Sequence, residues 1–74
     1  MSRHYLKKRS FQISGHRTSI ALEQDFWNIL DQMAVSKNLT LLHLITEIDA
    51  KRCANHPLSS RLRLTALHFI LKKI

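Results

Sequence analysis

The stretch HRTSIALE, residues 16–23, follows a two-residue pattern. Thr18, Ile20 and Leu22 share one set of alternating positions, and two of these three residues are β-branched. A two-residue period of this kind predicts a half-buried β-strand. We expect Ile20 and Leu22, with Thr18 beside them, to face the rest of the protein. The residues expected to face outward are Arg17, Ser19 and Ala21.

Upstream of this strand, Phe11 and Ile13 continue the alternation, and the only glycine, Gly15, lies between the two segments. A single glycine in such a pattern indicates a bend or a bulge. The chain therefore offers one short strand near its N-terminus, or at most two. Residues 1–8 show no periodicity and are interpreted as a flexible basic arm, so the folded domain is expected to span residues 9–74.

Downstream of Glu23, the apolar residues change to helical spacing. Phe26, Ile29, Leu30 and Met33 fall at positions i, i+3, i+4 and i+7, which predicts an amphipathic helix. Asn38 stands where such a helix commonly ends in a left-handed residue.

Two further helices are expected. Thr40 is a suitable N-cap for the second, which has an apolar stripe from Leu41 to Ile48 and ends before Asn55-His56-Pro57. Ser59 or Ser60 is expected to cap the third, which continues to Leu71. Because apolar residues nearly encircle this third helix, we expect it to pack against a second chain.

A single strand followed by helices leaves backbone donors and acceptors without partners. Antiparallel pairing with the same strand of a second copy, related by two-fold symmetry, satisfies them. It also helps a lone domain of 74 residues, which is marginally stable. The predicted fold class is mainly α with one short N-terminal strand, in an intertwined homodimer.

The charge is distributed in three blocks. Residues 1–17 carry a net charge of +5, residues 18–49 carry −4 and residues 50–74 carry +6, which gives +7 for the chain. Two basic segments around a folded centre are typical of a protein that binds a polyanion, and nucleic acid is the preferred candidate. The alternative is that these lysines and arginines are ordinary solvated surface residues without a ligand.

Several motifs together resemble the ribbon-helix-helix (MetJ/Arc-type) superfamily. They are the HRTSxxLE strand of residues 16–23, Phe26-Trp27, the turn Asn38–Leu41 and Glu47-Ile48-Asp49. The pattern is most similar to small bacterial ribbon-helix-helix domains, and the resemblance covers roughly Arg9 to Phe69. It implies a symmetric dimer whose two-stranded β-ribbon enters the major groove of double-stranded DNA. The function so implied is a transcriptional regulator, either a repressor or an antitoxin-like module.

The resemblance also implies roles for particular residues. Arg17, Ser19 and Ala21 match the outward strand positions that contact bases, although Ala21 is shorter than the polar residue common there. The start of the second helix, Thr40, Leu41 and Leu42, would hold a DNA phosphate. Simple N-capping by Thr40 and an exposed Ser19 without a function remain open alternatives.

Two further sets of residues have expected roles. The basic residues at the end of the arm and just after it can follow the phosphate backbone or enter a minor groove, or they can belong to a solvated tail; they are Lys7, Lys8 and Arg9. The expected dimer core consists of Ile20, Leu22, Phe26, Trp27, Leu30, Leu44, Ile45 and Ile48.

Other functional classes find little support in the sequence. The five histidines and the single Cys53 match no compact ligand spacing, so we expect neither a metal nor a cofactor. No spacing of nucleophile, base or paired carboxylates indicates an enzyme. The single cysteine precludes an internal disulfide and fits a cytoplasmic protein; no membrane span is expected.

Two alternatives to the DNA-binding regulator remain open. In the first, the ribbon-helix-helix dimer is a scaffold for a protein partner, with the small Ser19 and Ala21 at the contact. In the second, the basic end of the third helix, residues 64–74, associates with anionic membrane.

Overall fold

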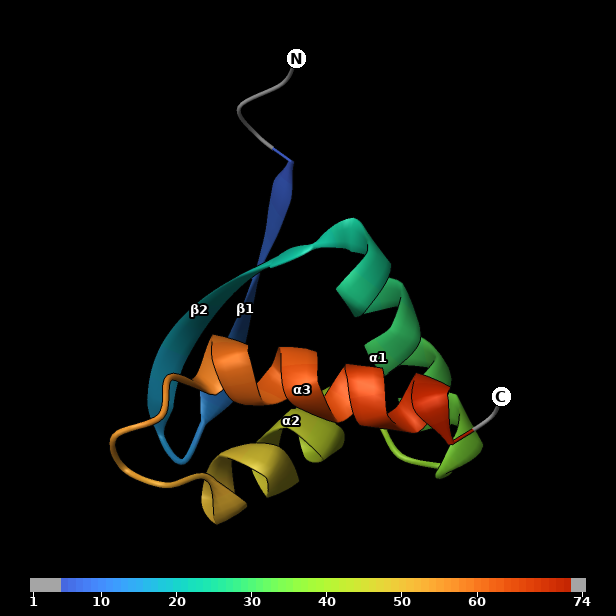
Figure 1. Cartoon of the computed structure of the whole chain (residues 1–74). Coiled ribbons are helices and arrows are strands. Elements are labelled where there is room, and N and C mark those ends of the chain that lie inside the picture. Colours follow the sequence, from blue (N-terminus) through green and yellow to red (C-terminus); the bar gives the residue numbers. More distant parts are fainter. Residues whose placement is uncertain (1–4, 73–74) are drawn as a thin grey trace.

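The computed structural model describes residues 5–72. A β-hairpin stands at one side of the molecule, α1 continues from its second strand, and α3 crosses over α2 (Figure 1). The elements in chain order are β1 (Leu6–Ile13), β2 (His16–Glu23), α1 (Gln24–Ser36), α2 (Leu41–Lys51) and α3 (Leu58–Leu71).

The two strands are joined by the shortest common hairpin connection. Ile13 pairs with His16, so the turn consists of Ser14 and Gly15, with φ angles of 51° and 81°. Two successive positive φ angles are what a type I′ turn requires, and its twist matches that of the flanking strands. The bend expected at Gly15 is therefore a tight turn, and it folds a full second strand back on the first.

The fold class with one short strand is thus wrong, and the second strand that the sequence left open is present. The flexible arm predicted for residues 1–8 is wrong at residues 6–8, which lie in β1. Residues 1–4 of the predicted arm lie outside the described residues. The full length of the strand was not predicted because only Ile13 is fully buried and the N-terminal half, apart from Leu6, is charged. Pairing with β2 supplies the backbone hydrogen bonds that define β1.

The inner face of the hairpin joins the three helices in one core. Ile13, Ile20 and Leu22 are 4%, 4% and 0% exposed, as the alternation in residues 16–23 predicts for the last two. The helices contribute buried residues to the same cluster: Trp27, Leu30 and Ala34 from α1, Leu44 and Ile45 from α2, and Leu62 and Ala66 from α3.

Two of the three expected helix-end signals are confirmed. Asn38 adopts a φ of 61° after α1, and the hydroxyl of Thr40 accepts a hydrogen bond from the His43 amide at 3.0 Å. The cap expected at Ser59 or Ser60 is wrong, because α3 already begins at Leu58 behind Pro57. Pro57 is the N-cap residue, with a φ of −61°, and its carbonyl accepts a hydrogen bond from the Arg61 amide at 3.2 Å; no side-chain cap hydrogen bond is present.

α3 packs against its own chain. Leu62 and Ala66 are fully buried, while Leu64, Leu67 and Leu71 are about half exposed, on the side turned away from the core. The burial of Leu62 and Ala66 therefore needs no second chain, contrary to the expectation for this helix. No helix within residues 5–72 has the length and apolar character to cross a membrane.

Candidate functional site

The outer face of the hairpin is the surface that the sequence analysis singled out. Directly opposed residues of an antiparallel pair lie on the same face, so the strand register assigns both strands. We define the outer face as three cross-strand pairs on the side of the hairpin opposite to the buried Ile13, Ile20 and Leu22: Lys8 with Ala21, Ser10 with Ser19, and Gln12 with Arg17.

The chemistry of this face is polar and basic. Five of its six residues are exposed and Ala21 is half-buried. In the middle, the hydroxyl oxygens of Ser10 and Ser19 are 3.0 Å apart and form a hydrogen bond across the strands. Lys8 and Arg17 give the face two positive charges, and none of its six residues is acidic.

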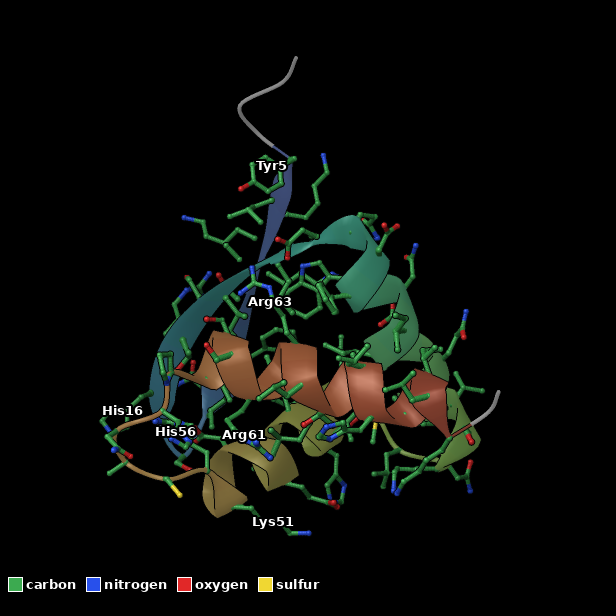
Figure 2. All side chains as sticks on the ribbon, viewed as in Figure 1. Tyr5, His16, Lys51, His56, Arg61 and Arg63 are labelled. Carbon is green, nitrogen blue, oxygen red and sulfur yellow. The ribbon has the colours of Figure 1, made fainter. Side chains whose placement is uncertain are left out.

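Glu23 continues the same side of β2, but its charge is engaged. Arg63 of α3 donates from Nε to Glu23 Oε1 at 2.9 Å, and Figure 2 shows Arg63 extending from α3 toward the end of β2. The hydrogen bond from Arg63 is the main cause that lowers the pKa of Glu23, and a backbone hydrogen bond adds to it. The carboxylate therefore stays ionised and bound to α3 at neutral pH.

The opposite side of β1 is attached to α1. The indole Nε1 of Trp27 donates to the carbonyl of Lys7 at 2.7 Å, and the ring itself is fully buried. The Arg9 guanidinium lies 4.7 Å from the Trp27 ring centroid, and its Nη1 is 3.2 Å from Asp31 Oδ1. These contacts hold the ribbon in one orientation relative to the helices.

The structure separates the three basic residues once assigned to the arm. Lys8 is on the outer face, Lys7 is exposed on the opposite side, and Arg9 is engaged with Asp31 and Trp27. A guanidinium in an ion pair and a ring contact is not free for a phosphate. We therefore leave Arg9 out of the candidate DNA contacts.

The expected phosphate site lies in the helical layer. Thr40 is the N-cap of α2, and Leu41 and Leu42 are its first two residues. Among the hydrogen bonds and ion pairs of residues 5–72, none joins this turn to the outer face. Thr40 performs the capping role that the sequence left open, and phosphate binding remains a separate prediction.

The residues expected to form a dimer core are buried within one chain. Six of them are at most 4% exposed, and Phe26 and Ile48 are half-buried against the same cluster. Their burial needs no second copy. The six are Ile20, Leu22, Trp27, Leu30, Leu44 and Ile45.

Sequence reasoning missed Ser10, Gln12 and the position of Lys8. The available signal was the Ser14-Gly15 pair, since such dipeptides mark tight turns between strands. Given that turn, the register follows directly: each outward residue of β2 acquires a partner on β1.

Metal binding has no geometric support in the described part of the chain. Within residues 5–72, no three His, Cys, Asp or Glu side chains gather where they could hold an ion.

Comparisons with known proteins agree with this architecture. A family model described as the ribbon-helix-helix domain matches residues 6–70. Among solved structures, an uncharacterized protein from Bordetella pertussis Tohama I is similar, with a TM-score of 0.77 and 28% sequence identity. The alignment covers 96% of this chain and 61% of that one, so the present chain spans less than two thirds of that protein. No curated protein matches the sequence.

Proposed function

The chain belongs to the ribbon-helix-helix domain family, and we propose that it is a homodimeric regulator that binds double-stranded DNA through the outer face of its hairpin. Domains of this family generally bind DNA in transcription regulators, and they generally dimerise. A repressor or antitoxin-like role in the bacterial cytoplasm belongs to the same proposal.

The observation that carries the proposal is the composition of the outer face. It has hydrogen-bonding or basic side chains at five of six positions, and it has no acid. A two-stranded ribbon is narrow enough to enter the B-DNA major groove, where each base pair presents its own donors and acceptors. One chain already supplies both strands of such a ribbon.

Individual positions match particular base edges. Arg17 can donate two hydrogen bonds to a guanine, and its cross-strand neighbour Gln12 can pair with an adenine through its amide. Ala21 fits a thymine methyl, and Lys8 opposite it can reach a phosphate. Base contacts are proposed for Arg17, Ser19, Ala21 and Gln12, and phosphate contacts for Lys7, Lys8 and the start of α2 at Thr40, Leu41 and Leu42.

Dimerisation would place two hairpins on the two halves of a symmetric site. Because β2 is already paired with β1, its backbone does not need a strand of a second copy as a partner on that edge. How the two copies contact each other is therefore left open by the proposal.

The experiment that tests DNA binding is fluorescence anisotropy of a labelled mixed-sequence duplex at several salt concentrations. Neutralised phosphates predict that log affinity falls linearly with log salt, by about 0.9 for each phosphate contacted. A slope that corresponds to several contacts supports the proposal. No binding at low salt would overturn it, given a net charge of +7.

Arg17→Ala tests the assignment of the outer face. We expect specific affinity to fall by about tenfold or more, since a bidentate contact with guanine contributes about 1–3 kcal/mol. Stability should hardly change, because Arg17 is exposed. Lys51→Ala, which removes a positive charge from the helical layer, is the matched control and should reduce the specific affinity for DNA much less. Equal losses in the two variants would remove Arg17 from the set of base contacts.

A second candidate function is a scaffold for a protein partner. Its supporting observation is the centre of the outer face, where Ser10 and Ser19 bond to each other beside Ala21. This centre is small and offers little reach into a groove. Absence of duplex binding together with a stable dimer would favour this candidate.

A further inference from the structure

A basic groove lies among the three helices, away from the hairpin. It consists of two adjoining hollows of about 200 and 370 Å³, which share Met33, Lys37 and Thr65. All lining residues come from α1, α2, α3 or their C-terminal caps, and no strand residue contributes. The groove is therefore a surface distinct from the outer face.

The floor of the groove is apolar and its margins are positive. Met33, Leu44, Ile48 and Phe69 line the bottom. Figure 2 shows Arg61 extending from α3 toward α2, and Lys51 standing on α2 below it. The four cationic side chains that line the groove are Lys37, Lys51, Arg61 and Lys72.

These four cations have no acidic partner in the described chain. None of them forms an ion pair within residues 5–72. The one carboxylate in the lining, Glu47, lies 3.2 Å from Nε2 of His43 on its own helix. Like charges held around an apolar floor favour an occupant that brings both negative charge and apolar surface.

A second copy of this chain is poorly suited to that role. Three of its five acidic residues already lie within 3.2 Å of an arginine of the same chain, Glu47 lies beside His43 in the groove itself, and only Asp25 has no such neighbour among the described residues. The three acids paired with arginine are Glu23, Asp31 and Asp49. The complementary charge must therefore come from another molecule.

The dimensions suit a helix. Along α3 the groove extends from Arg61 to Lys72, three turns that correspond to about 16 Å. An amphipathic helix of that length places its apolar residues at i, i+3, i+4 and i+7 in such a groove, and its acidic flanks then meet the basic margins.

We propose that the groove formed by α1, α2 and α3 is a docking site for an acidic amphipathic helix of a partner protein. The site is independent of the proposed DNA contact, so the protein can hold DNA with the hairpin and a second protein with its helices.

A designed peptide tests this proposal. The probe is a fluorescent helix of about 14 residues with leucines along one stripe and glutamates on both flanks. The control peptide keeps the leucines and has lysine in place of every glutamate. Anisotropy at about 150 mM salt, where long-range attraction is screened, should show binding of the acidic peptide only.

Two triple variants locate the site. Lys37→Gln, Lys51→Gln and Arg61→Gln together remove three charges from the groove and should weaken the acidic peptide about tenfold or more. Lys7→Gln, Lys8→Gln and Arg17→Gln remove the same number from the hairpin and should leave the affinity for the peptide unchanged. Equal weakening by the two triples would overturn the proposal, because non-specific attraction would then explain binding.

Amide NMR of the wild-type protein adds a readout that does not depend on variants. The acidic peptide should shift signals of residues 33–37, 44–51 and 61–72 and leave the hairpin signals in place. Shifts confined to the hairpin would contradict a groove site.

Two other ligands give further tests of the groove. Displacement of the peptide by a mixed-sequence duplex would contradict the proposal and assign the cations to nucleic acid. Binding of decanoate without binding of the peptide would also contradict it and would indicate a small organic acid.

Discussion

The ion pair between Glu23 and Arg63 joins two positions 40 residues apart in the chain. It connects the end of β2 to α3, and the two side chains are 35% and 33% exposed. The Arg63 hydrogen bond holds the pKa of Glu23 below its usual value, so folding favours the ionised carboxylate. The stability contribution of this pair therefore depends on pH in a defined direction.

We expect Glu23→Gln to lower the unfolding temperature at pH 7 by more than it does near pH 3. The contribution is complete above the ordinary glutamate pKa of about 4.3, and it is lost as the pH falls through the lower value of the folded state. Thermal unfolding of the variant and the wild type at both pH values measures this. Asp25→Asn is the control, because it removes an unpaired carboxylate from the same helix start. An equal loss at pH 7 and pH 3 would contradict the assignment.

The turn between β1 and β2 determines which residues face each other on the ribbon. Ser14 and Gly15 both have positive φ, which asparagine and glycine adopt more easily than serine. A slip of one residue would move every outward side chain to the inner face. The composition of the outer face therefore depends on these two residues.

Ser14→Asn should stabilise the protein by about 0.5 kcal/mol, which raises the unfolding temperature by a few degrees in a domain of this size. Gly15→Ala should destabilise it by about 1 kcal/mol. A Cβ on Gly15 would meet no atom within 4 Å, so this loss reports backbone conformation alone. If both substitutions proved neutral in thermal unfolding, the turn would not control the hairpin.

The attachment of β1 to α1 depends on one buried side chain. Trp27 fills the space beneath the hairpin and contacts Phe11, whose ring centroid is 6.0 Å away. It also donates its indole hydrogen to Lys7 and lies beneath Arg9. Trp27 thus adds an attachment between α1 and β1 to the Arg9–Asp31 ion pair and to the pairing of β1 with β2.

Trp27→Phe should lower the free energy of unfolding by about 2 kcal/mol, from the lost hydrogen bond and the smaller ring. Urea denaturation measures the change, with Val35→Ala of the same helix as the control. Val35 is 79% exposed, so its truncation should change stability by no more than about 0.5 kcal/mol. If Trp27→Phe lowered the free energy of unfolding by no more than about 0.5 kcal/mol, the contacts of Trp27 with β1 would contribute little to stability.

The molecule as a whole has a small core and two separate basic surfaces. Ten residues are buried among residues 5–72, and exposed leucines remain on α3. The hairpin carries the proposed DNA contact, and the helices carry the basic groove. A second copy would add the burial that a domain of this size needs.

We expect sedimentation equilibrium at tens of micromolar to give a mass near twice 8.7 kDa. The unfolding temperature should rise with protein concentration, because dissociation accompanies unfolding of a dimer. A single species of 8.7 kDa whose stability is independent of concentration would exclude the homodimer. DNA binding through one hairpin would remain testable in that case.

Features that depend on neighbours in the sequence were predictable from it. The alternation in β2 put Ile20 and Leu22 in the core, Asn38 ended α1 in a left-handed conformation, and Thr40 capped α2. Each of these depends on side-chain periodicity, local sterics or a hydrogen bond within three residues. Half of the outer face, the β2 residues, followed from the same alternation.

Features that depend on distant partners emerged only with the tertiary structure. β1 is defined by its pairing with β2, Arg9 is engaged by Asp31, and Glu23 by Arg63. The groove exists only because α1, α2 and α3 meet there. Local sequence carries little information about such contacts. A polar strand and a flexible arm can have the same local sequence, and so can an arginine in an ion pair and a solvated one. A partner that is distant in the sequence decides between them.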